Sequence, residues 1–144
     1  MHNGESKMKA RSKKSVCIVA LALLMGKVYA APTPAACPDV SVIKQHQEGQ
    51  GFVYTAPAPN NQQWRGENPR GDAKDINSIA FKTANIRNRS AITGNAFVAC
   101  DYEGNSSAGI RMSLETLKVA TPVGKAWSGL SCSESHPSLC TFEY

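Results

Sequence analysis

The chain has 144 residues, with 16 Lys and Arg against 11 Asp and Glu, and a formal net charge of +5. Six of the basic residues and one acid precede residue 31, so the remainder carries ten charges of each sign. A nucleic-acid-binding domain normally has a basic excess that displaces counterions from phosphates. The neutral remainder therefore argues against a nucleic-acid partner, and it gives no support for electrostatic attraction to anionic membranes.

The first thirty residues have the pattern of a secretory signal peptide. Five Lys and Arg between Lys7 and Lys14 precede an apolar run from Val16 to Met25, and Val28-Tyr29-Ala30 supplies a small-residue cleavage pattern. The run is about half of the ~20 residues that a membrane-spanning helix needs. We predict a signal peptide at residues 1–30, cleavage after Ala30, a periplasmic or secreted location and no stable membrane anchor after cleavage.

Four cysteines follow this leader: Cys37, Cys100, Cys132 and Cys140. An even count of cysteines in an exported chain predicts two disulfides. Three pairings are possible from sequence alone. We favour the pair of Cys132 with Cys140, because the seven residues between them are rich in turn formers. Cys37 would then pair with Cys100.

The spacing of cysteine and histidine gives no support to a metal or redox site. No Cys-x-x-Cys occurs, and His46 and His136 are isolated from each other and from the cysteines. We therefore expect no metal ligands and no cofactor.

After the leader, we divide the chain into a flexible Pro/Ala tether at 31–36 and one disulfide-stabilised globular domain at 37–144. Asp39 or Ser41 could cap a short helix that passes through His46 and closes at Gly49 or Gly51, where glycine can adopt a left-handed conformation. The aromatic and β-branched residues of 51–55 then predict a strand.

Residues 60–75 are rich in Asn, Gln, Gly and charge, and we interpret them as a long loop with Trp64 as its single large apolar residue. For 78–84 we favour a strand, although 76–87 also fits helical spacing. Alternation in 96–103 and 110–115 predicts a β-hairpin. Shorter strands are expected within 119–127 and 140–144.

The expected fold class is α+β or mainly β, with a small antiparallel sheet of about four to six strands and one short N-terminal helix.

Aromatic residues in polar, glycine-bearing loops are the candidate binding residues. Trp64 and Arg65 lie in one such segment and Trp127 in another. Tryptophan there can stack on a sugar ring or fill a pocket in a partner. Packing of Trp64 over the core is the alternative.

Catalytic motifs are absent from the sequence, and we assign no catalytic residue. No Gly-x-Ser-x-Gly occurs. Asp101 and Glu103 could form a carboxylate pair, and His136 could titrate near neutrality, but a solvated strand face and a solvated loop are the commoner explanations. These three residues would be the candidates if the protein were an enzyme.

Several short segments occur in an order similar to that of small secreted bacterial proteins of the domain-of-unknown-function type. They are Cys37-Pro38 after the leader, 51–56, Trp64, 81–84, 100–103 and 140–142. This resemblance implies export and no defined activity. The strand around Cys100 also resembles periplasmic lysozyme inhibitors, which are small disulfide-bonded β-barrels.

We therefore expect an exported, non-enzymatic interaction module that binds a protein or glycan outside the cytoplasm. An inhibitor of an exogenous hydrolase such as lysozyme is one alternative, and a small secreted enzyme or effector is another.

Overall fold

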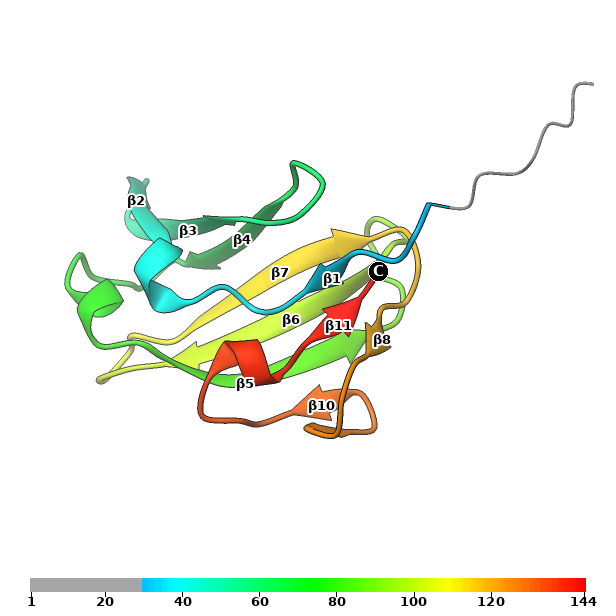
Figure 1. Ribbon diagram of the computed structural model, residues 1–144. Helices are drawn as coiled ribbons and strands as arrows, with labels where there is room; N and C mark the ends of the chain where they lie inside the picture. The colour runs from blue at the N-terminus through cyan, green and yellow to red at the C-terminus, as the bar shows by residue number, and fades with distance from the viewer. Residues whose placement is uncertain (1–29) are drawn as a thin grey trace, which may run out of the picture. The chain divides into compact units, whose positions relative to one another are not determined.

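The computed structural model describes residues 30–144 and is mainly β (Figure 1). Its strands form two antiparallel sheets, one of eight strands and one of three, and the described residues contain 3-10 turns but no α-helix. The expectation of one helix and a sheet of four to six strands was wrong. The predicted leader, apart from Ala30, lies outside the described residues. No helix within them is long and apolar enough to cross a membrane.

The large sheet has the strand order β2-β3-β4-β7-β6-β5-β10-β9. Its strands are β2 (Lys44–Glu48), β3 (Gly51–Pro57), β4 (Gln63–Asn68), β5 (Ala80–Arg87), β6 (Ala96–Glu103), β7 (Ile110–Thr116), β9 (Trp127–Ser128) and β10 (Ser131–Cys132). The predicted hairpin is confirmed, because β6 and β7 pair along their length from Ala96 opposite Thr116 to Tyr102 opposite Ile110.

The small sheet has the order β1-β11-β8 and lies across one face of the large sheet (Figure 1). Its strands are β1 (Pro34–Ala35), β8 (Thr121–Pro122) and β11 (Phe142–Glu143). We expected a flexible tether at 31–36. In the structure, part of this segment forms β1, which pairs with β11. Thr33 and Tyr144 extend this pairing by exchanging two main-chain hydrogen bonds of 3.0 and 3.2 Å, so the end of the chain lies beside the start of the domain.

The predicted N-terminal helix is a 3-10 turn followed by a strand. Asp39 does act as a cap, but only for the turn Val40–Val42, and β2 then pairs with β3. Gly49, which we expected to end a helix, has a φ of 62° in the two-residue connection between β2 and β3. A positive φ at this position is what a tight hairpin turn needs, so the glycine signal was correct and its assignment to a helix was wrong.

The predicted loop at 60–75 contains β4. Asn60 and Asn61 both have a φ of 57° and turn the chain into β4, which pairs with β3. Alternation along β4 directs Trp64 and Gly66 inward and the charged residues Arg65 and Glu67 outward. Because one of the two inward positions is glycine, the strand lacks the apolar alternation that sequence patterns detect.

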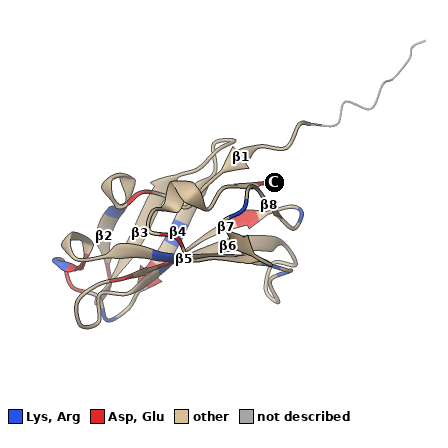
Figure 2. Ribbon diagram, turned by 60° about the horizontal axis from the view of Figure 1, so that its bottom comes forward, with Lys and Arg blue, Asp and Glu red and all other residues tan. Residues whose placement is uncertain are grey.

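The core lies between the two sheets. Inward residues of β3, β4, β6 and β7 form one apolar cluster with Phe142 of the small sheet. The outer face of the large sheet carries the polar side chains of strands in which polar and apolar residues alternate. In β7, for example, Arg111, Ser113 and Glu115 alternate with buried apolar side chains. Figure 2 shows charges of both signs distributed over the strands and loops.

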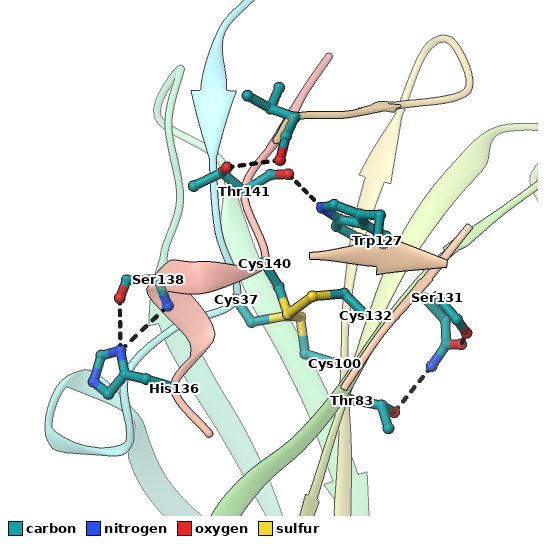
Figure 3. Close-up of a disulfide and its surroundings, with 12 residues drawn as sticks. Cys37, Thr83, Cys100, Trp127, Ser131, Cys132, His136, Ser138, Cys140 and Thr141 are labelled. Carbon is teal, nitrogen blue, oxygen red and sulfur yellow. Dashed lines mark hydrogen bonds between the residues drawn. A yellow bond between two sulfur atoms is a disulfide. The ribbon is translucent and has the colours of Figure 1, made fainter. Parts of the chain in front are cut away.

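Both favoured disulfides are present (Figure 3). Cys37 follows β1 and bonds to Cys100 of β6, with 5.8 Å between their Cα atoms. Cys132 of β10 bonds to Cys140, which precedes β11, with 5.7 Å between Cα atoms. All four side chains are buried. Each bridge therefore joins the large sheet to a segment next to the small one.

Candidate binding groove

The outer face of the large sheet has a groove where β4 and β7 meet. These strands pair at only two positions, Arg65 opposite Ser113 and Gly66 opposite Met112. This open hollow has a volume of about 650 Å³ and is lined mainly by outward residues of both strands.

Side-chain amides join the chain at the two ends of this junction. The Gln62 amide donates to the Glu115 carbonyl at 3.0 Å. At the other end, the Asn68 amide donates to the carbonyls of Ser107 and Gly109 at 2.9 and 3.0 Å. These amides therefore join β4 to the β7 side of the sheet at positions where the short ladder supplies no main-chain hydrogen bond.

Arg65 lies on the β4 side of the groove and pairs with two carboxylates. Its guanidinium is 3.0 Å from a Glu67 carboxylate oxygen and 3.5 Å from one of Glu48 on β2. The Arg65 side chain remains 52% exposed, so these carboxylates orient the guanidinium without covering it. It can still donate hydrogen bonds to a ligand.

Arg111 lies on the β7 side and forms a two-pronged pair with Asp101 of β6. Its Nε and one terminal nitrogen donate to the two carboxylate oxygens at 2.6 and 2.9 Å. These hydrogen bonds, with the attraction of the carboxylate charge, raise the pKa of the Arg111 guanidinium. The Arg111 side chain is 58% exposed, whereas Asp101 is 26% exposed.

A chain of polar side chains continues from Asp101 across the sheet. Thr83 of β5 donates to Asp101 at 3.3 Å, and the Asn85 amide donates to Thr83 at 3.0 Å. Ser131 of β10 donates to the Asn85 side-chain oxygen. Figure 3 shows the Thr83 and Ser131 end of this chain. This chain thus connects Arg111 of β7 to residues from three further strands, β6, β5 and β10.

The three candidate binding residues predicted from the sequence lie in different environments in the structure. Arg65 lines the groove. Trp64 is 1% exposed and packs in the core, so its ring offers no surface to a ligand. Trp127 is half-buried, and its indole N–H donates to the Thr141 carbonyl at 2.7 Å (Figure 3). The structure therefore favours the core-packing alternative for Trp64.

The residues considered for catalysis each pair with a different group. Asp101 pairs with Arg111, Glu103 is 3.5 Å from Lys82, and His136 Nε2 is 3.1 Å from an Asp39 carboxylate oxygen. Among residues 30–144, no ion pair or hydrogen bond joins any two of the three candidates. The same residues contain no cluster of three or more His, Cys, Asp or Glu side chains that could hold a metal ion.

Sequence reasoning missed Arg111 and Ser113 as groove residues. Their signal was present, since both are polar positions of the alternation that predicted the hairpin. What the sequence did not show was that β7 pairs with β4 and that outward side chains of both strands line one hollow.

Comparison with known families places nearly all of the described residues in one family. The model of a family described as a protein of unknown function, DUF3757, matches residues 32–143. No curated protein and no solved structure matches the chain.

Proposed function

This chain belongs to the DUF3757 family of proteins of unknown function, and we propose that it is an exported, non-enzymatic module that binds a glycan. The binding surface is the groove between β4 and β7. The observation that carries this proposal is the pair of half-exposed guanidiniums, Arg65 and Arg111, which carboxylates orient on opposite sides of one open groove.

The polar groups of the groove suit a ligand with hydroxyl groups. Arg65 and Arg111 supply donors, Glu67 and Glu115 supply acceptors, and Ser113 supplies both. A sugar hydroxyl both donates and accepts a hydrogen bond, so it can use such a mixed surface. A phosphate-rich ligand would instead favour a surplus of basic groups.

Export is supported by the leader pattern at 1–30 and by the two disulfides, which persist in oxidising compartments. A non-enzymatic role is supported by the separate partners of Asp101, Glu103 and His136. The periplasm or the medium outside the cell is therefore where we expect the glycan partner.

Binding should be weak, because the residues that line the groove include no aromatic ring on which a sugar could stack. We expect a Kd of about 0.1–1 mM for a short oligosaccharide. Nuclear magnetic resonance detects binding in this range. The probes would be soluble oligosaccharides of neutral, amino and uronic-acid sugars, each titrated into isotopically labelled protein.

We expect shifts of the Arg65 and Arg111 side chains and of the Ser113 amide. Arg65→Ala should weaken binding about tenfold, because hydrogen bonds from a charged donor are lost. Ser113→Trp should block the groove. Arg70→Ala is the matched control, since Arg70 is an exposed arginine that does not line the groove. Absence of binding to every sugar class, or shifts confined to another surface, would disprove the proposal.

A further inference from the structure

β2 is an edge strand whose outer side has no backbone partner. Its neighbour in the sheet is β3, and it ends the strand order on that side (Figure 1). Among residues 30–144, no main-chain hydrogen bond outside the β2–β3 ladder involves residues 44–48. Four of its five residues are exposed. An edge of this kind is a template for pairing with another strand.

The sequence of β2 complements itself in an antiparallel arrangement. With His46 at the centre of a two-fold axis, Lys44 of one copy faces Glu48 of the other at both ends of the strand. Gln45 faces Gln47 in the same register. Oppositely charged side chains that face each other across antiparallel strands stabilise the pairing.

We propose that β2 pairs antiparallel with β2 of a second copy of this chain, joining the two large sheets into one continuous sheet. Such an interface is isologous, so each favourable pair occurs twice. A register shifted by two residues would place Lys44 opposite His46 or Glu48 opposite His46. The charge complementarity therefore selects the register centred on His46.

The neighbouring side chains leave this edge accessible. His46 Nε2 lies 3.0 Å from Thr55 Oγ1 of β3, which directs the imidazole toward β3 and away from the open edge. The Gln45 amide donates to the Tyr54 hydroxyl and to the Asp72 carbonyl, both at 2.8 Å. Glu48 is 67% exposed at 3.5 Å from Arg65, so it can also pair with an approaching Lys44.

Charge reversal tests both the surface and the register. Lys44→Glu places glutamates opposite each other at both ends of the strand, and Glu48→Lys places lysines there. We expect each single change to weaken dimerisation about tenfold or more, because two pairs change from attraction to repulsion. The double variant Lys44→Glu/Glu48→Lys restores opposite charges in every facing pair and should restore the dimer.

Sedimentation velocity over a range of concentrations measures the dimer, and thermal unfolding confirms that each variant is folded. Lys125→Glu is the matched control, because Lys125 is an exposed lysine in the connection between β8 and β9. A wild-type protein that stays monomeric at millimolar concentration would overturn the proposal, as would a dimer unaffected by the single changes. Failure of the double variant to recover would overturn the proposed register.

Discussion

The rings of Trp64 and Phe142 meet edge to face, with centroids 6.3 Å apart and planes at 82°. Trp64 belongs to β4 of the large sheet and Phe142 to β11 of the small one. Both side chains are almost fully buried. This contact therefore joins the two sheets at the centre of the core, and Trp64, which was a candidate for ligand binding, is in a position to contribute to stability.

Trp64→Ala should destabilise the protein by about 3–5 kcal/mol, because it removes a large buried side chain and leaves a cavity. Equilibrium unfolding in urea measures this loss. Arg65→Ala is the control, since the neighbouring side chain points to the outer face and its ion pairs are exposed. An unchanged free energy of unfolding in Trp64→Ala would contradict the core role.

Gly66→Ala should disrupt the junction of β4 and β7. A Cβ at Gly66 would collide with the main-chain carbonyl of Arg111, and backbone atoms cannot move aside as a side chain can. We expect a destabilisation of about 1–3 kcal/mol together with altered resonances around the groove. In Gly109→Ala the new Cβ would make only an ordinary contact with the Tyr102 carbonyl at 3.7 Å. Equal losses in the two variants would count against this explanation.

The two disulfides should contribute unequally to stability. The bridge from Cys37 to Cys100 closes a separation of 63 residues, and that from Cys132 to Cys140 closes 8. In the chain-entropy model, paired Ser substitutions cost about 4 kcal/mol for the long loop and about 2.5 kcal/mol for the short one. Chemical denaturation of the two double variants tests the order, which the opposite ranking would refute.

Ionised Asp39 should stabilise the protein above acidic pH. Hydrogen bonds from the Ser41 hydroxyl and backbone amide, with a smaller contribution from His136, lower the pKa of the Asp39 carboxyl from its ordinary value of 3.8. A carboxyl with a lower pKa in the folded state gives stability that is complete above the unfolded value and lost as pH falls through the folded value.

Comparison of wild type with Asp39→Asn measures this effect. The melting temperature of the wild type should exceed that of the variant near neutral pH, and the difference should shrink as pH falls below 3.8. Asp72→Asn controls for general loss of an exposed carboxylate, since Asp72 also caps a local turn through Lys74. A pH-independent difference between wild type and Asp39→Asn would show that ionisation is not the cause.

Export predicts a specific mass for the purified protein. After cleavage behind Ala30, the chain should begin at Ala31 and lack four hydrogen atoms, two for each disulfide. Intact mass spectrometry before and after reduction and alkylation tests both points. An uncleaved chain with free thiols would contradict the predicted location.

The sequence predicted the elements whose alternation is strong and local. The hairpin of β6 and β7 follows from alternating residues on both sides of a turn-rich connection, and the structure confirms it. The N-terminal helix was wrong because Val42, Ile43 and His46 fit helical spacing by chance over a short segment. Gly49 was consistent with either a helix end or a hairpin turn.

The groove was harder to predict because it depends on pairing between distant segments. Arg65 was a candidate, but Asn68 contacts Gly109 across a separation of 41 residues, which no local pattern reports. The pairing of β4 with β7 over only two positions is likewise a property of the assembled sheet. The disulfide pairing was one of three that the sequence allowed, and the one favoured for the turn-rich segment between Cys132 and Cys140 is confirmed.

The main-chain hydrogen bonds between Thr33 and Tyr144 have a consequence for how the chain can be connected. Since Thr33 and Tyr144 lie side by side, a short linker could join these two positions without disturbing either sheet. New ends could then be opened in the exposed turn at 91–94 between β5 and β6. A circular permutant of this kind should keep the same strand pairings, because the fold depends on which strands meet and not on their order along the chain.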